Sequence, residues 1–246
     1  MAMEHVHHMK GGVGETSYAN NSSLQRKVIM EVKTILEENM APKNLVKNGV
    51  PLNKGNIYLS KTSPPSVYEA YFKQFERDFQ YFLKLRFKEL ALDGTMALTF
   101  IGTESHDKIS VQGVLGMVLN EMVQEGLVEE NKLDMFNFPT YHPTEEEVRQ
   151  VIETEGSFTL QIIKTFKMGW DANLEKDNVN YVVDRKMRGE FISKHHRAVF
   201  EPLLISGFGE NIMDVLFSRF EKLLTQLIEF ETLEFTNIVL FLTKDS

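Results

Sequence analysis

Strand-like segments alternate with helix-like segments along most of this chain, and this alternation limits the possible folds more than any other feature. Three segments have the apolar or alternating pattern of β-strands: residues 95–101, 157–166 and 235–242. Amphipathic helical stretches lie between them, over residues 111–125, from 144 onward, and over 189–205 and 209–229, the last two separated by Gly207-Phe208-Gly209. Such alternation predicts an α/β sheet with helices on its faces, and the extra helices before the last strand predict a cap over one edge.

The first part of the chain contains two further predicted helices and a loop. A Gly-rich arm of about twenty residues precedes a helix that begins at Ser22, where Gln25 completes a capping box. Residues 41–55 lack periodicity and predict a loop, and residues 56–60 predict a short strand. After Pro64-Pro65 we expect a long helix that stops near Asp93-Gly94. Its aromatic stripe is expected to pack in the core and comprises Tyr68, Tyr71, Phe72, Phe75, Phe79, Phe82 and Leu83.

Composition excludes several classes of protein. A chain of 246 residues is long enough for one domain with a sizeable core. A net charge of −8 argues against a nucleic-acid partner, which needs clustered Lys and Arg. With no cysteine, disulfides and thiolate chemistry are excluded. Since no apolar run is long enough to cross a bilayer and the N-terminus lacks the layout of a signal peptide, we expect no membrane partner and a cytoplasmic protein.

A set of short motifs, in order along the chain, resembles the SABATH family of plant methyltransferases. These enzymes transfer a methyl group from S-adenosylmethionine to salicylate, benzoate, jasmonate, indole-acetate or xanthines. The matching segments are residues 8–22, 53–58, 61–65, 75–79, 129–139, 155–158, 197–202 and 208–210. Each motif is weak by itself, but the ordered set is specific.

The resemblance implies a Rossmann-like class I methyltransferase sheet that is incomplete. The family's Gly-rich Asp-Leu-Gly-Cys turn, its ribose-binding Asn-Asp-Leu segment and its Pro-Gly-Ser-Phe stretch do not occur in this sequence. At about 30 residues for each βα unit, the gap after Met40 is on the order of a hundred residues. We therefore expect one methyltransferase domain, 1–246, made of an arm and first helix (1–40) and the C-terminal half of the sheet with its cap (41–246). The first strands and most of the S-adenosylmethionine site are missing, which leaves an unpaired sheet edge.

The resemblance also assigns residues to the acceptor and the cofactor. Lys10 and Gln25 occupy the positions that clamp the acceptor's carboxylate, a pairing of cation and amide that suits this anion. Without the resemblance, Lys10 would be a solvated lysine and Gln25 part of a helix cap. Tyr18 occupies a position that contacts the cofactor. Pocket-wall positions map to Tyr141, His196, Val199 and Phe235, and Gln112 replaces the family's usual tryptophan.

Some family members bind magnesium near the acceptor. The corresponding residues are Asn53, Asp134, Phe136 through its carbonyl, and Asn137. Oxygen ligands of this kind suit a hard cation. Equally, Asp134 and Asn137 are ordinary turn formers before Pro139, and this alternative stays open.

Two classes of function follow from these observations. The first is an S-adenosylmethionine-dependent methyltransferase that acts on the carboxylate of a small acid, of the salicylate, benzoate or jasmonate type. The second is an inactive remnant, or a partner of an intact paralogue, since family members form homodimers. A xanthine-type N-methyltransferase is a further enzymatic alternative, which the Lys10–Gln25 pair disfavours.

Overall fold

The computed structural model describes residues 42, 44–172, 174 and 184–244. The chain divides after Ala41 into two units, and all described residues belong to the second, Pro42–Ser246. The predicted helix from Ser22 lies outside the described residues.

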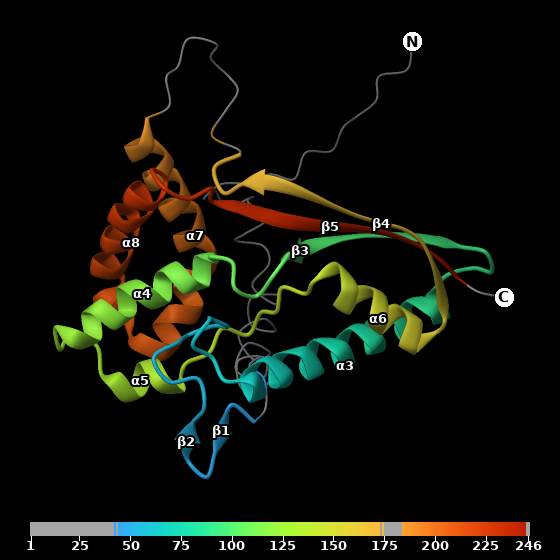
Figure 1. The fold of residues 1–246 in the computed structure, drawn as a ribbon, viewed down its shortest axis with the longest axis horizontal. Helices are drawn as coiled ribbons and strands as arrows, with labels where there is room; N and C mark the ends of the chain where they lie inside the picture. The colour runs from blue at the N-terminus through green and yellow to red at the C-terminus, as the bar shows by residue number, and fades with distance from the viewer. Residues whose placement is uncertain (1–41, 43, 173, 175–183, 245–246) are drawn as a thin grey trace, which may run out of the picture. The chain divides into compact units, whose positions relative to one another are not determined.

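A three-stranded sheet organises this unit (Figure 1). Its strands are β3 (Thr95–Gly102), β4 (Phe158–Gly169) and β5 (Glu234–Lys244), in the order β3-β5-β4. The central strand β5 is antiparallel to both neighbours, so β3 and β4 run in the same direction. The three strands predicted from the sequence are confirmed. Within the described chain, β3 is an edge strand.

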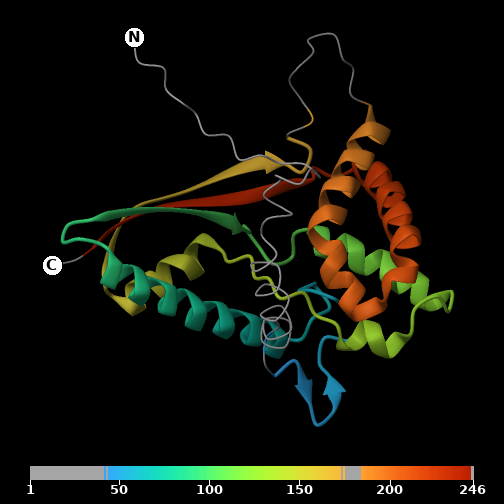
Figure 2. The same cartoon turned by 180° about the vertical axis from the view of Figure 1, so that it is seen from behind.

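Two helices cover one face of the sheet, α3 (Pro65–Glu89) and α6 (Glu145–Glu155), as Figures 1 and 2 show from opposite sides. Alternate residues of β5 point into this layer. The fully or nearly buried apolar residues there are Leu83, Val148, Ile152, Phe158, Ile238, Leu240 and Leu242. Phe75, Phe79 and Phe82 of the aromatic stripe pack against them, which confirms the stripe as core. On the opposite face Ile162, Phe166 and Phe241 are exposed, and no helix of the described chain covers them.

The other helices form a group beyond one end of the sheet (Figures 1 and 2). They are α4 (Val111–Gln124), α5 (Glu130–Met135), α7 (Arg185–Phe208) and α8 (Met213–Leu227), with the 3₁₀ turn η1 (Glu210–Ile212). Their apolar faces meet in a second core, in which Leu115, Leu119, Leu204 and Phe220 are fully buried. None of the helices described has the length and apolar character to cross a membrane.

Side-chain caps fix the start of two helices. Thr144 accepts a hydrogen bond from the amide of Glu147, and the Glu147 carboxylate accepts one from the amide of Thr144 at 2.7 Å. The two bonds form a capping box, which is typical of a Thr followed three residues later by a Glu. Ser110 caps α4 by accepting from the amide of Gly113 at 3.0 Å.

The prediction of a short strand over residues 56–60 is wrong, because this segment has no regular secondary structure. Ile57, Tyr58 and Leu59 are all buried in the helical core rather than alternating between a sheet's two faces. Turns occupy the neighbouring backbone, with the Asn56 amide donating to the Asn53 carbonyl at 3.0 Å. The Ile57 carbonyl accepts a single bond from the amide of Phe138 at 2.7 Å, so no ladder forms.

The segment predicted as a loop before it contains a small hairpin. β1 (Val46–Lys47) pairs antiparallel with β2 (Val50–Pro51). Asn48 and Gly49 connect them, both with positive φ, of 52° and 77°. Asn-Gly is the usual sequence for such a two-residue hairpin turn.

The end predicted for the helix over residues 189–205 is three residues too early. Helix α7 continues through Gly207 to Phe208 and ends at Gly209, whose φ is 86°. Gly207 has a packing role, because a Cβ there would lie 2.4 Å from the ring of Phe136. The helix also begins at Arg185, four residues earlier than predicted, where Asp184 caps it by accepting from the amide of Met187.

Leu240 and Phe241 are neighbours on β5 with opposite environments, which provides a test of this architecture. We expect Leu240→Ala to lower the free energy of unfolding by about 2–5 kcal/mol, because it opens a cavity in the buried layer. Phe241→Ala is the matched control, because Phe241 is 44% exposed. It should lower the free energy of unfolding clearly less than Leu240→Ala does. Urea denaturation measures both, and equal losses would contradict the assignment of the buried face.

Candidate functional site

A pocket lies where the carboxyl ends of β3 and β4 meet the first residues of β5. Its cavity volume is about 70 Å³, and the surrounding depression opens to solvent. Gly102 ends β3, Trp170 directly follows β4, and Phe235 and Thr236 begin β5, and all four line the pocket. Ligands of open α/β sheets bind outside the carboxyl ends of the strands, so this is the expected position for a binding site.

One wall of the pocket combines Tyr58 with His142. The Tyr58 hydroxyl accepts a hydrogen bond from the amide of His142 at 3.2 Å, and the two rings lie 5.5 Å apart between centroids. Burial raises the pKa of Tyr58 and lowers that of His142 to about 4, with the nearby His106 adding to the second shift. Both side chains are therefore neutral near pH 7.

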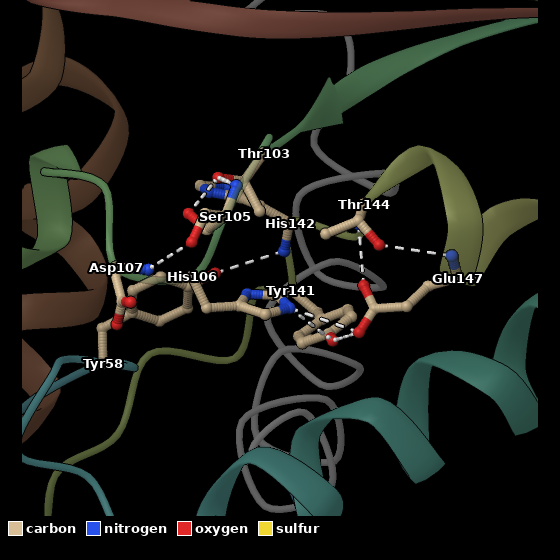
Figure 3. Close-up of polar contacts among 9 residues, drawn as sticks. All are labelled: Tyr58, Thr103, Ser105, His106, Asp107, Tyr141, His142, Thr144 and Glu147. Atoms are coloured by element: carbon tan, nitrogen blue, oxygen red, sulfur yellow. Dashed lines mark hydrogen bonds and ion pairs between the residues drawn. The ribbon is translucent and has the colours of Figure 1, made fainter.

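A hydrogen-bonded cluster ties this wall to α6 (Figure 3). The Tyr141 hydroxyl donates to Glu147 Oε1 at 2.6 Å, and His106 Nε2 lies 3.2 Å from the same oxygen. Burial opposes ionisation of Glu147, but the hydrogen bonds from His106, Tyr141 and Thr144 outweigh it and lower the pKa of the carboxyl. Burial and the bond to Glu147 raise the pKa of Tyr141. Tyr141 thus holds the loop that carries His106, a residue that lines the pocket.

Aromatic rings support the pocket from behind. The ring of Trp170 lies 5.8 Å from that of Phe235 and 6.2 Å from that of His196, centroid to centroid. His196 is 4% exposed, and its Nδ1 donates to the Ile192 carbonyl at 2.7 Å within α7. Burial lowers the pKa of His196 to about 4, so it is a neutral packing residue at pH 7.

The four predicted pocket-wall residues have different positions. Phe235 lines the pocket. Tyr141 and His196 lie one layer behind it, in contact with lining residues. Val199 is 57% exposed on α7 and is not among the lining residues. Lys10, Tyr18 and Gln25 lie outside the described residues, so their roles stay predictions.

Three of the predicted magnesium ligands, Asn53, Asp134 and Asn137, are hydrogen-bonded to protein groups in the structure. Asn53 Nδ2 donates to Asn137 Oδ1 at 2.9 Å, and Asn53 Oδ1 accepts from Ser63 at 2.7 Å. Asp134 accepts from the amide of Gly55 at 2.8 Å. Since both amide oxygens are already bonded and a single carboxylate is present, the set as arranged does not fit a hard cation. No group of three or more acidic or histidine ligands occurs in the described part of the chain, and magnesium stays a prediction.

Sequence reasoning missed Tyr58, Trp170 and His142 as lining residues. Trp170 had a partial signal, because it lies four residues after the strand predicted over 157–166, and it directly follows the observed β4. The sequence gives no such signal for Tyr58, because this residue lines the pocket from a segment with no regular secondary structure.

Comparison with known proteins agrees with this geometry. The model of the SAM dependent carboxyl methyltransferase family matches residues 4–42 and, separately, residues 39–245. The benzoic acid/salicylic acid carboxyl methyltransferase 1 of Petunia hybrida is 43% identical over 204 residues, which cover 81% of this chain and 55% of the relative. A 3,7-dimethylxanthine N-methyltransferase of Camellia sinensis var. assamica is 39% identical over 210 residues, 83% of this chain and 55% of that protein.

A solved structure supports the fold. The structure of loganic acid methyltransferase with SAH superposes with a TM-score of 0.70 at 31% identity, covering 84% of this chain and 58% of that one. The described sheet and helices correspond to part of an α/β methyltransferase fold. Within the methyltransferases of this fold, the chain belongs to the SABATH family. It spans a little over half the length of the curated relatives that it matches.

The buried His196 should make stability depend on pH. Its pKa is about 4 in the folded chain against 6.5 ordinarily, so the unfolded chain binds more protons between these values. Its contribution to stability is complete above pH 6.5 and is lost as the pH falls toward 4. The unmodified chain should lose unfolding free energy as the pH falls from 6.5 to 4. We expect this loss to be smaller in His196→Gln by about 1–3 kcal/mol. Urea denaturation at several pH values measures the difference.

Val199 is exposed on the same helix, carries no titratable group and provides the control for this experiment. Val199→Ala should follow the pH dependence of the unmodified chain. If both substitutions change the slope equally, the protonation of buried His196 is not its cause.

The contacts around Asn53 give a third prediction. Asn53→Ala removes the bond that buried Ser63 donates and the bond that half-buried Asn137 accepts, so we expect a loss of about 1–3 kcal/mol in unfolding free energy. Asn131→Ala, at an exposed position of α5, is the control. Millimolar magnesium should leave the melting temperature of the unmodified chain unchanged. A magnesium-dependent rise that disappears in Asp134→Asn would contradict this and establish the ion.

Proposed function

We propose that this chain is the acceptor-binding side of a carboxyl methyltransferase and holds a small carboxylic acid for methylation by S-adenosylmethionine. The observation that carries the proposal is the pocket at the carboxyl ends of β3 and β4, lined by Trp170 and Phe235, in a chain of this family. Its aromatic and neutral polar wall suits a small organic acid.

The chemistry requires orientation more than a base. A carboxylate is already ionised at neutral pH, so no side chain has to remove a proton from it. The protein must hold one carboxylate oxygen in line with the methyl group and exclude water. Lys10 and Gln25 are proposed to bind that carboxylate, as the resemblance to the family implies. S-adenosylmethionine supplies the methyl group when bound.

A carboxylate acceptor is favoured over a xanthine. The proposed Lys10–Gln25 pair is matched to an anion, whereas a xanthine nitrogen carries no such charge. Identity to the Petunia benzoic acid/salicylic acid enzyme is also slightly higher, at 43% against 38–40% for the xanthine-methylating and caffeine-forming relatives.

We expect this chain to bind the methyl donor, S-adenosylmethionine, weakly. The sequence has no Gly-rich turn of the kind that holds the nucleotide, and the family model matches in two separate pieces. A second candidate function follows, a non-catalytic partner of an intact relative or of a second copy. The edge strand β3 favours it, because an unpaired edge is a template for pairing with another chain.

Isothermal titration of the full chain separates these possibilities. We expect benzoate or salicylate to bind, and S-adenosylhomocysteine not to bind in the micromolar range, because the strands that would form its site are absent from the sequence. Phe235→Ala should weaken acid binding, and Val199→Ala, at an exposed position, is the control.

The other outcomes are equally informative. Micromolar binding of S-adenosylhomocysteine would overturn the loss of the donor site, and methyl-transfer assays with salicylate, benzoate, jasmonate and xanthines would follow. A folded chain that binds no acid would overturn the acceptor role. Dimerisation in sedimentation experiments would then support the partner function.

A further inference from the structure

Strand β3 forms one edge of the sheet, and its outer side has no partner in the part of the chain that the structure describes (Figure 1). An edge strand presents unpaired backbone N–H and C=O groups, which can pair with a strand of another chain. Folded proteins usually protect such edges with charged side chains, prolines or bulges. The two edges of this sheet differ in that protection.

The β4 edge is protected and the β3 edge is not. β4 carries the exposed Lys164 and Lys167, and a bulge interrupts its pairing with β5 between Leu160 and Ile162. β3, over residues 95–102, contains no charged residue and no proline, and it pairs with β5 in one continuous register. β3 is therefore the edge that stays open to another strand.

The register of β3 identifies which of its residues face outward. The Lys244 amide donates to the Gly94 carbonyl at 2.9 Å, so these two form a hydrogen-bonded pair of the antiparallel ladder. Bonded and non-bonded pairs alternate along such a ladder, so every second residue of β3 directs its N–H and C=O away from β5. The amide of Thr103 continues this series and donates to the Pro143 carbonyl at 2.9 Å, which marks the end of the open edge. The outward residues before it are all exposed, and they are Thr95, Ala97, Thr99 and Ile101.

These four residues are self-complementary about Leu98. If β3 pairs antiparallel with β3 of a second copy so that Leu98 lies opposite Leu98, then Thr95 lies opposite Ile101, and Ala97 lies opposite Thr99. All four outward residues then find partners. Residues opposite each other differ by an even number of positions, so the buried faces of both copies stay on the same side of the joined sheet.

Charge favours a second copy at this edge. Because β3 has no charged side chain, the two-fold axis brings no like charges together within the strand pair. Self-pairing of β4 would instead bring Lys164 and Lys167 close to the lysines of the second copy, which is unfavourable.

We propose that a second copy of this chain pairs with the β3 edge, so that two three-stranded sheets join in the order β4-β5-β3-β3-β5-β4. A complete sheet of this class continues with further strands beyond β3, so complete relatives would not have this contact. The inference rests on the second candidate function and names its partner and its surface. One strand pair is a small interface, and we expect a dissociation constant of about 1–100 µM.

Sedimentation velocity of the full chain at several concentrations tests the proposal. Thr99→Pro removes one outward N–H without removing a bond to β5, and it should weaken the dimer at least about tenfold. Thr165→Pro is the matched control at the β4 edge. The Trp170 amide donates to the Leu233 carbonyl at 3.0 Å, and the alternation from this bond makes the N–H of exposed Thr165 outward as well. Thr165→Pro should leave the dimer unchanged.

Single cysteines test the register, because the chain has none of its own. Leu98→Cys places two thiols opposite each other in a non-bonded pair, with Cα atoms about 4.5 Å apart, which a disulfide can span. Met96→Cys is the control, since each thiol then lies opposite Phe100 of the second copy. Oxidised glutathione should convert Leu98→Cys into a covalent dimer on a non-reducing gel, and Met96→Cys should stay monomeric on that gel.

Several outcomes would overturn the inference. The unmodified chain could stay monomeric up to about 200 µM. Thr99→Pro and Thr165→Pro could weaken the dimer equally, or the two cysteine variants could cross-link equally. Circular dichroism confirms that each variant is folded, and if Thr99→Pro does not fold, the cysteine pair decides.

Titration of the same samples with salicylate separates this inference from the acceptor role. A monomer that binds salicylate overturns the dimer and leaves the acceptor role standing. A dimer that binds no acid supports the pairing at β3 and overturns the acceptor role.

Discussion

The described fold depends on the central strand β5, which pairs with β3 on one edge and β4 on the other. No other strand of the described sheet has two partners. One face of β5 supplies Ile238, Leu240 and Leu242 to the buried layer beneath the sheet. Its first residues bring Phe235 and Thr236 to the pocket, between the ends of β3 and β4. Pairing, core and site therefore depend on the same strand.

Glu147 links the fold to the pocket. One carboxylate oxygen accepts from the amide of Thr144 and starts α6, and the other accepts from Tyr141 and contacts His106. The same side chain thus fixes a helix start and the loop after β3. Its ionised state stabilises both contacts, which agrees with the lowered pKa of the carboxyl. We assign it a positioning role, because both of its oxygens are bonded to protein groups and it does not line the pocket.

The sequence predicts the elements well where the signal is local. The β-strands follow apolar alternation, and the α6 capping box follows from Thr144 and Glu147 alone. Prediction fails where tertiary contacts decide. Residues 57–59 are apolar because they fill the helical core, and Gly207 is small because Phe136 packs against it. For the site, the resemblance identifies Phe235, but the contact between Tyr58 and His142 spans 84 positions and has no sequence signal.

Acceptor binding and donor binding have different structural requirements in this chain. The pocket is formed by the ends of β3 and β5, by Trp170 directly after β4, by the start of α4, and by Tyr58 and His142 from the loops. A nucleotide site in an α/β sheet needs further parallel strands beyond β3 and the turns that follow them. The contacts that hold the lining residues, between Tyr58 and His142 and between Trp170 and Phe235, do not involve the outer edge of β3. The proposed acceptor site therefore does not require the strands that a donor site would need.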